Sequence, residues 1–405
     1  HAAELLTAVR SEAKRVGVLV DNPRLDWGAV MKRRAMTVSR LAAGTRDLVT
    51  SNGVDYVEGE AVLKSATSVE VGGRGIIEAD AIVIATGSEP DIPDVPGFDL
   101  DGVISSDEAL SLSALPASLA ISGGGVIGME FAAAFAAFGV AVTVIVTSPE
   151  ILRSMDPESA VILRKALEKK GVTFLRGYSV ADVTKAAAGS GAEGLKIALD
   201  SEAGPKELLA EKLLVAKGRR PYTRGLGVEA LGIRMERGRI LTDRHMETSV
   251  RGVYAIGDCV NSYMLAHVAS REGEVAVDNI FGQDAEMDYT TTPGCVYTSP
   301  ELASVGLTER EAEKEGHKIR VGRFPLIMNG KSVITGDNGG MMKVIADGET
   351  KKILGVHMVG GPATEMIAEA ALALHFGATP EDLVRTIHAH PTVCESLAGA
   401  AANVF

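Results

Sequence analysis

The sequence predicts an α/β protein in which a parallel sheet is followed by a region of antiparallel strands. Residues 119–217 alternate short apolar strands with helical segments, a rhythm typical of βαβ units. A glycine-rich turn joins the first of these strands to its helix. From about residue 289 several short apolar strands follow one another. These three observations predict the fold class, and a chain of 405 residues has room for about two to four domains.

Two helices are predicted to open the chain, because apolar residues recur at helical spacing in residues 1–17 and 27–50. Residues 54–71 and 75–88 then alternate or run apolar in short lengths separated by glycine, which predicts strands. The last of these, "AIVIATG", is expected to be a buried strand that ends in a tight turn at Gly87.

The rest of the chain continues both patterns. In the parallel region we expect strands at 118–123, 141–146 and 172–177 and helices at 126–138 and 157–170. A buried strand at 252–260 and a helix near 264–281 follow. The antiparallel strands are expected at 294–308, 331–337, 340–347 and 353–360, and helices at 366–377 and 380–385.

Composition excludes several kinds of partner and site. The net charge is −12 and the basic residues are scattered, whereas nucleic-acid binding needs a basic face. Cys259, Cys295 and Cys394 form no C-x-x-C or C-x4-C pair, so no metal site or disulfide framework is predicted and reduced, cytosolic thiols are expected. Residues 119–146 are apolar enough to span a bilayer, but their glycines and β-branched run favour strand, turn, helix and strand instead.

A G-x-G-x-x-G motif formed by Gly123, Gly125 and Gly128 follows a predicted strand and opens a predicted helix. In this context the first glycine permits the turn, the second lets a pyrophosphate approach the backbone, and the third lets the helix pack on the strand. The helix N-terminus then holds the phosphates. We therefore predict a dinucleotide site, with a purely structural glycine turn as the alternative.

The acidic residue that binds ribose is expected about 20 residues after this motif, at the end of the second strand. Val146 occupies that place, followed by Thr147 and Ser148, and Glu150 lies beyond a proline turn. No arginine suited to a 2′-phosphate stands there either. The motif thus predicts a dinucleotide without deciding between NAD and NADP.

Two isolated carboxylates carry further predictions. Glu130 lies inside an apolar helix, where an unpaired carboxylate is costly, so it is either exposed at the helix end or paired with a lysine from elsewhere. Asp258 follows a buried strand and a glycine, the position at which parallel strands hold ligand hydroxyls. A helix N-cap is the simpler alternative for Asp258.

The string "HAHPTVCE" near the C-terminus suggests acid/base chemistry. His388 and His390 fall on the same side of the chain if the segment is extended. Glu395 is a carboxylate that could fix the tautomer of an imidazole and raise its basicity. We take His390 as the candidate base and Glu395 as its partner, against the alternative of a packed or capping histidine.

Together these motifs resemble the flavin-dependent pyridine-nucleotide disulfide oxidoreductases, and within them the dihydrolipoamide dehydrogenase branch. The resemblance covers essentially the whole chain. It rests on the strings "ATGSEPDIPDVPG", "SGGGVIGMEF", "KGRRPYTRGLGVE", "VYAIGDCV", "MLAHVASREGEVAVDNI", "VYTSPELASVGLTE", "ILGVHMVGGPATEMIAEAALAL" and "HAHPTVCE".

The resemblance implies a reaction in which protein-bound dihydrolipoamide is oxidised to lipoamide by way of an enzyme disulfide and FAD, with reduction of NAD. His390 would take the proton during thiol–disulfide interchange, with Glu395 orienting it. Glu130 would pair with a lysine beside the flavin. Further cofactor contacts are implied for Gly87, Asp258, Ala266, His267 and Gly218.

The same resemblance implies two Rossmann-like nucleotide-binding domains, the first of them incomplete, and an α+β C-terminal domain. The expected limits are 1–117 with 246–288 for the FAD-binding domain, 118–245 for the NAD-binding domain and 289–405 for the C-terminal dimerisation domain. We expect a cytoplasmic homodimer in which His390 completes the partner subunit's site. Its partners would be lipoyl-bearing carrier proteins of 2-oxoacid dehydrogenase or glycine cleavage complexes, with no nucleic acid and no membrane.

The chain departs from the family's pattern in several places. It contains neither the FAD glycine motif nor the redox C-x4-C, so we expect a further segment before His1 and expect these 405 residues alone to be inactive and to retain flavin poorly. Cys394 replaces a serine, Val146 replaces the glutamate of NAD-using members, and Lys217 precedes Gly218 near the nicotinamide site. The alternatives are a non-catalytic nucleotide-binding remnant and another flavoprotein disulfide reductase.

Overall fold

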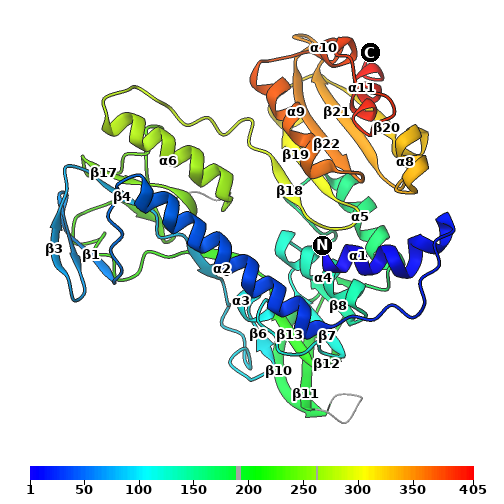
Figure 1. Ribbon diagram of the computed structural model, residues 1–405, viewed down its shortest axis with the longest axis horizontal. Helices are drawn as coiled ribbons and strands as arrows, with labels where there is room; N and C mark the ends of the chain where they lie inside the picture. The colour runs from blue at the N-terminus through cyan, green and yellow to red at the C-terminus, as the bar shows by residue number, and fades with distance from the viewer. Residues whose placement is uncertain (188–192, 261–262) are drawn as a thin grey trace. The chain divides into compact units, whose positions relative to one another are not determined.

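The computed structural model describes residues 1–187, 193–260 and 263–405. The chain divides into two compact units, and Figure 1 labels many of their helices and strands. The first unit contains residues 1–27, 92–217 and 290–405, and the second contains residues 28–91 and 218–289. Parallel and antiparallel sheets occur together with helices, which confirms the predicted α/β class.

A five-stranded sheet in the first unit has the strand order β6-β13-β7-β8-β9, and every neighbouring pair is parallel. α4 (Val126–Phe138) connects β7 to β8, and α5 (Pro157–Lys169) connects β8 to β9, as the βαβ pattern predicts. The strands are β6 (Val103–Ile104), β13 (Lys212–Val215), β7 (Ser118–Ser122), β8 (Ala141–Val146) and β9 (Thr173–Arg176).

Both faces of this sheet are buried, which explains why its strands read as continuous apolar runs. Ile121, Val144 and Leu214 point into one hydrophobic cluster, while their neighbours Ile145 and Leu213 point into another. The apolar stretch 119–146 is therefore β7, a glycine turn, α4 and β8. Within the described part of the chain, no helix combines the length and apolarity needed to cross a bilayer.

Local signals set the limits of the two connecting helices. α4 begins after Gly125, which is extended, and ends at Gly139, whose φ of 95° only glycine adopts at little cost. α5 begins after Asp156, whose carboxylate accepts the backbone N–H of Ser159, with Pro157 in the first turn. The carboxyl ends of β7, β8 and β13 consequently face the N-termini of these helices along one edge of the sheet.

The C-terminal part of the first unit is a five-stranded antiparallel sheet of order β18-β19-β22-β21-β20. α9 (Ala363–His375) packs on β19 and β22, and α11 (Glu395–Ala402) packs on β20 and β21 (Figure 1). A separate three-stranded sheet is formed by β10, β11 and β12. The remaining elements are β18 (Gly294–Val296), β19 (Leu302–Gly306), β20 (Ile319–Pro325), β21 (Met341–Asp347), β22 (Ile353–Val359), α7 (Glu309–Lys314), α10 (Pro380–Arg385), β10 (Ser179–Ala187), β11 (Glu193–Asp200) and β12 (Lys206–Ala210).

The predicted strand at 331–337 is wrong, because α8 (Gly330–Thr335) occupies this segment. The side chain of Asn329 caps the helix by accepting the N–H of Ser332, and Gly336 ends it with a φ of 80°. The β-branched residues that favoured a strand lie exposed on this short helix. The caps at the two ends therefore outweigh the strand propensity of the residues between them.

The second unit contains all but the first residue of α2 (Trp27–Ser51), the predicted second helix. Its parallel pair β4 (Ile82–Ile84) and β17 (Val253–Ala255) leads into a 3-10 turn, η3 (Gly257–Cys259), and then into α6 (Ala266–Ile280). Small antiparallel pairings complete the unit. They are β1 (Ala61–Ser65), β2 (Ser68–Val71) and β3 (Gly75–Glu78), β5 (Ser88–Pro90) with β14 (Arg219–Pro221), and β15 (Met235–Glu236) with β16 (Arg239–Ile240).

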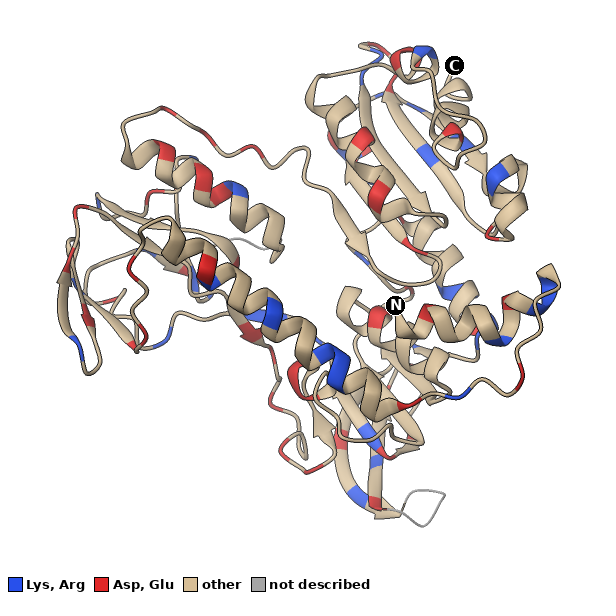
Figure 2. Cartoon of the chain, in the orientation of Figure 1, with Lys and Arg blue, Asp and Glu red and all other residues tan. Residues whose placement is uncertain are grey.

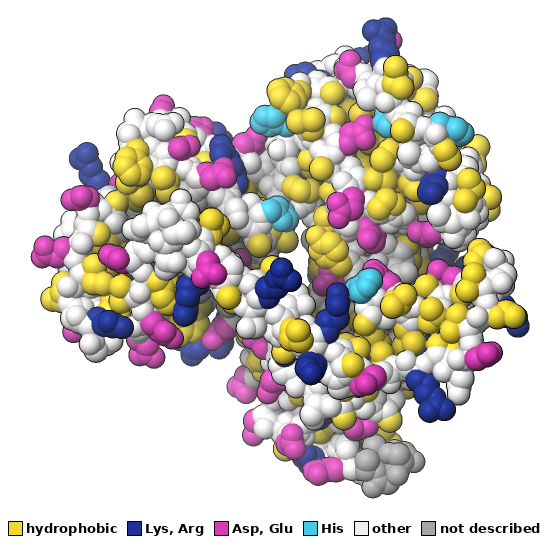
Figure 3. Space-filling view, viewed as in Figure 1, with side chains coloured by type: hydrophobic (Ala, Val, Ile, Leu, Met, Phe, Trp, Pro, Cys, Tyr) yellow, Lys and Arg dark blue, Asp and Glu magenta, His cyan; other side chains and the backbone are white. Residues whose placement is uncertain are grey.

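The opening helix predicted at 1–17 is irregular. α1 (Ala2–Thr7) continues through a π-helical turn, η1 (Ala8–Glu12), and a 3-10 turn, η2 (Ala13–Val16). Figure 2 shows lysine and arginine interspersed with acidic residues along the elements, and Figure 3 shows the same mixture of charged and apolar side chains on one face.

Candidate functional site

The glycine turn between β7 and α4 is a tight crossing of backbone. A Cβ atom at Gly123 would lie 2.1 Å from the carbonyl oxygen of Ala216, and one at Gly128 would lie 2.2 Å from the carbonyl oxygen of Gly123. A Cβ at Gly125 would meet no heavy atom within 4 Å. The first and third glycines are thus required by the fold itself. The second leaves open space at the start of α4, where backbone N–H groups attract a phosphate.

The end of β8 carries no free carboxylate. The side chain of Val146 faces the glycine turn, since a Cβ at Gly124 would lie 2.8 Å from its Cγ1. Glu150 is held by the guanidinium of Arg164, whose Nε is 2.8 and 3.0 Å from its two oxygens, and by the N–H of Ile151. Glu150 therefore cannot take the role of the missing ribose-binding acid.

Lys217 follows β13 at the same edge of the sheet. Its backbone nitrogen would lie 3.4 Å from a Cβ at Gly123, so it borders the glycine turn. Burial lowers the pKa of its ammonium group. Gly218 has a φ of 135° and open space where a Cβ would stand.

In the second unit, the parallel pairing of β4 with β17 brings the predicted flavin residues together. The Asp258 carboxylate accepts a 2.6 Å hydrogen bond from the hydroxyl of Ser88, directly after Gly87. The Nε of Arg219 donates to the same hydroxyl at 2.7 Å. Gly87 has a φ of 70° and open space at its Cβ position. The carboxylate of Asp258 thus accepts a side-chain hydrogen bond at the carboxyl edge of a strand pair. Asp258 itself lies within the 3-10 turn η3.

Glu272 is a buried residue of this unit that the sequence analysis missed. One of its oxygens accepts the N–H of Gly257 at 2.6 Å and the other accepts the hydroxyl of Tyr289 at 2.6 Å. The hydrogen bond to Gly257 fixes the turn that carries Asp258. Burial and the hydrogen bond to Glu272 together raise the pKa of Tyr289. Ala266 and His267 form the first turn of the same helix, α6. A glutamate on the apolar side of a predicted helix was the available signal for Glu272.

Glu130 lies on α4 and is partly buried rather than free in solvent. Its Oε1 accepts the backbone N–H of Tyr297 at 2.9 Å. Burial raises the pKa of Glu130, and the hydrogen bond from Tyr297 opposes that shift. Among the described residues no lysine pairs with it, so the predicted lysine partner stays a prediction.

The two histidines of "HAHPTVCE" differ in their surroundings. Both ring nitrogens of His388 are engaged, Nδ1 with the carbonyl of Thr386 and Nε2 with Glu369, each at 2.9 Å. The imidazole of His390 is 78% exposed, and its Nδ1 lies 2.9 Å from Oε1 of Glu395. Within the described part of the chain its Nε2 has no partner. His390 therefore presents one ring nitrogen to a ligand, whereas His388 presents none.

The fold holds the His390–Glu395 pair in place from several sides. Glu395 is the first residue of α11, and its second oxygen accepts the N–H of Thr392 at 2.9 Å. This hydrogen bond and the one with His390 lower the pKa of Glu395. The side chain of Asn329 donates to the carbonyl of Thr392 at 3.0 Å, and Val393 is buried in the core. The nearby Cys394 is a free thiol of intermediate exposure, and partial burial raises its pKa.

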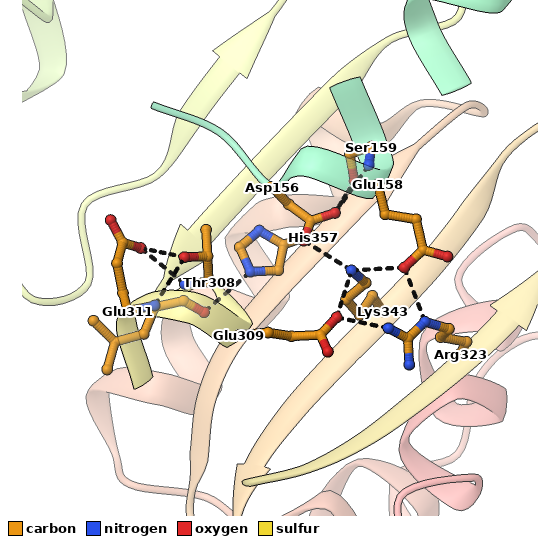
Figure 4. Close-up of polar contacts among 10 residues, drawn as sticks. Asp156, Glu158, Ser159, Thr308, Glu309, Glu311, Arg323, Lys343 and His357 are labelled. Carbon is orange, nitrogen blue, oxygen red and sulfur yellow. Dashed lines mark hydrogen bonds and ion pairs between the residues drawn. The ribbon is translucent and has the colours of Figure 1, made fainter. Parts of the chain in front are cut away.

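A second polar cluster, drawn in Figure 4, was not anticipated from the sequence. The ammonium group of Lys343 on β21 lies 2.8 Å from carboxylate oxygens of Asp156, Glu158 and Glu309. Arg323 on β20 also pairs with Glu158, at 2.9 Å. We call these five residues the Lys343 cluster. No group of three or more His, Cys, Asp and Glu side chains suited to a metal ion occurs among the described residues.

Comparisons with known proteins agree with this arrangement. A family described as pyridine nucleotide-disulphide oxidoreductase matches residues 4–273, and the dimerisation domain of that family matches residues 292–401. Dihydrolipoyl dehydrogenase 3 of Pseudomonas putida is 40% identical over 100% of this chain and 87% of its own length. Dihydrolipoyl dehydrogenase of Thermus scotoductus is 42% identical over 99% of this chain and 86% of its own.

Solved structures show the same fold. LpdA from Mycobacterium tuberculosis superposes with a TM-score of 0.90 at 26% identity and covers 100% of this chain and 88% of its own. The HOCl-induced flavoprotein disulfide reductase RclA from Escherichia coli superposes with a TM-score of 0.86 at 26% identity, covering 100% and 89%.

Proposed function

The chain belongs to the pyridine nucleotide-disulphide oxidoreductase family, and we propose that it acts as a dihydrolipoyl dehydrogenase. It is an oxidoreductase that uses FAD and NAD. Relatives of that name share 36–42% of their residues with it, whereas the flavoprotein disulfide reductase RclA shares 26%. This difference favours the dihydrolipoyl branch over other flavoprotein disulfide reductases.

The residues present fit both cofactors. Open space at Gly125 and Gly87, each beside the end of a strand, admits a phosphate or a ring close to the backbone. Asp258 uses one oxygen for Ser88 and can accept a hydroxyl of the flavin side chain with the other. FAD and NAD, when bound, supply the hydride chemistry, and the protein positions them.

The observation that carries the proposal is the exposed His390 held by Glu395. Because Nδ1 donates its proton to the carboxylate, the neutral ring keeps its lone pair on Nε2. Nε2 can then accept the proton of a dihydrolipoamide thiol and return it later, which makes that sulfur a thiolate and a nucleophile. Glu395 stabilises the imidazolium that forms and fixes the ring.

We further propose how the chain assembles and which partners it serves. The dimerisation domain makes the protein a homodimer. Ile387, three residues before His390, is 96% exposed, and an apolar side chain this exposed suits a contact with a second copy near the base. His390 would then serve the partner subunit's site. Lipoyl-bearing carrier proteins of 2-oxoacid dehydrogenase or glycine cleavage complexes fit this function.

The proposed limits of the domains are 118–245 for NAD binding and 289–405 for dimerisation, with FAD bound by the remainder. A cytoplasmic location is proposed because all three cysteines are free thiols.

The test uses the product of the complete reading frame that encodes these residues. It should reduce NAD with dihydrolipoamide, and His390→Gln should lower kcat by about 10²–10⁴-fold, the usual contribution of an acid/base group. His317→Gln is the control, since His317 pairs with Asp347 away from this site. Full activity of His390→Gln, or no reduction of NAD by dihydrolipoamide with the wild type, would overturn the proposal.

A further inference from the structure

The carboxyl edge of the parallel sheet places an arginine beside the residue that replaces the ribose-binding acid. β8 and β9 are parallel, and Val146 is paired in register with Arg176. Residues paired in this way point to the same face of a sheet. The side chain of Arg176 therefore starts on the face where Val146 meets the glycine turn.

Arg176 extends toward the loop that follows Val146. Its Nη1 donates to the carbonyl of Pro149 at 2.8 Å, and its side chain is 44% exposed. A guanidinium group has five N–H donors, so one anchoring hydrogen bond leaves others for a ligand. The arginine that the sequence analysis did not find after β8 is thus supplied by the neighbouring strand.

The carboxylate of Glu150 in this loop does not neutralise the positive charge that Arg176 presents to a ligand. Glu150 is 3.9 Å from Arg176, but its two oxygens are shared by the Nε of Arg164 and the N–H of Ile151. A glutamate at Val146 would accept ribose hydroxyls and repel a phosphate on the ribose. Valine does neither.

We propose that the dinucleotide site accepts NADP as well as NAD, with Arg176 as the cation that faces the 2′-phosphate. Val146 removes the repulsion that would exclude this phosphate, and Arg176 supplies an attraction that suits its geometry. The inference rests on the proposed function in one respect only, that the turn at 123–128 holds a pyridine dinucleotide.

The test measures equilibrium binding of NAD and NADP to the product of the complete reading frame by calorimetry, together with turnover of each. NADP should bind within about tenfold of NAD. Arg176→Gln should weaken NADP binding by about tenfold, with less than a twofold change for NAD, because a hydrogen bond between a cation and a phosphate contributes about that factor. Arg320→Gln on β20 is the matched control and should change neither.

Val146→Glu should shift the ratio of the two affinities toward NAD by at least about tenfold. If the added carboxylate prevents folding, Arg176→Gln alone decides. NADP that fails to bind while NAD binds would overturn this inference and leave the proposed function intact, as would equal losses of both nucleotides in Arg176→Gln. Failure to bind either nucleotide would instead contradict the proposed function.

Discussion

The Lys343 cluster and the His390–Glu395 pair combine a base with a carboxylate at nearly the same distance, 2.8 and 2.9 Å. Lys343 is 1% exposed and has three carboxylate partners, whereas His390 has one partner and is 78% exposed. A buried charge must be paired on all sides, because an unpaired one destabilises the fold. An exposed base can keep a nitrogen free. Burial, rather than the pairing itself, therefore separates the stabilising Lys343 cluster from the pair that we propose to be reactive.

The position of the Lys343 cluster explains its burial. Asp156 caps α5 beside the parallel sheet, while Lys343 and Arg323 stand on adjacent strands of the antiparallel sheet and Glu309 opens α7 (Figure 4). Hydrogen bonds to these carboxylates raise the pKa of Lys343, although burial opposes the shift. The ammonium group thus joins segments that lie far apart in the sequence, within one compact unit.

The largest effect on stability is expected for Lys343→Met. Removing the ammonium group leaves Asp156 buried without its cation, which should cost about 3–5 kcal/mol in the free energy of unfolding. Denaturant unfolding measures this loss. Lys318→Met is the control, because Lys318 pairs with Glu349 on the surface at 2.7 Å, where such pairs contribute at most about 1 kcal/mol. Equal losses in the two variants would contradict the distinction drawn from burial.

Glu395→Gln is expected to lower the catalytic rate without lowering the stability. The amide can still accept the N–H of Thr392, so the melting temperature should stay unchanged. It no longer stabilises an imidazolium on His390, and kcat with dihydrolipoamide should fall by about tenfold or more. The affinity for NAD, measured by calorimetry, should not change. A large fall in melting temperature with unaltered kcat would show that this pair is structural as well.

The stability of the protein should also depend on pH through a histidine beside the Lys343 cluster. His357 is fully buried beside this cluster, and its Nε2–H donates to the carbonyl oxygen of Leu307 at 3.1 Å. Among the described residues its Nδ1 has no partner, and burial lowers its pKa despite the nearby Asp156 and Glu311. The folded protein therefore keeps His357 neutral at pH values where the unfolded chain binds a proton. Its contribution to stability is complete above the ordinary value of 6.5 and is lost as the pH falls below it.

The expected loss is about 1.4 kcal/mol per pH unit for this one proton. Asp156 and Glu311 also have lowered pKa values, so their own losses begin only at lower pH. Unfolding free energies of the wild type and of His357→Leu, measured from pH 7 to pH 5, should differ in slope by about this amount. Parallel curves would mean that His357 binds its proton equally in the folded and the unfolded state, so that burial does not lower its pKa.

The sequence predicts one of these two regions and not the other, for a physical reason. His390 and Glu395 are five residues apart, and the glycine turn is contained in six consecutive residues. Both sites can therefore be recognised from the spacing of residues in the sequence. Asp156 and Lys343 are 187 positions apart, and only the packing of two sheets brings them together. Arg176 reaches the dinucleotide loop through strand pairing in the same way. Interactions that depend on tertiary packing have no local pattern to find.

The smallest effect is expected for His388→Gln, which tests a case between the two regions. His388 is nearly buried and pairs with Glu369 at 2.9 Å, but it lies only two residues before the exposed base. If burial decides the role, this variant should lose about 1 kcal/mol of stability for its two hydrogen bonds and less than about threefold in kcat. Denaturant unfolding and steady-state rates measure the two quantities. A loss of kcat comparable to that of His390→Gln would show that proximity to the base matters more than burial, because His388 would then be acting through the position of His390.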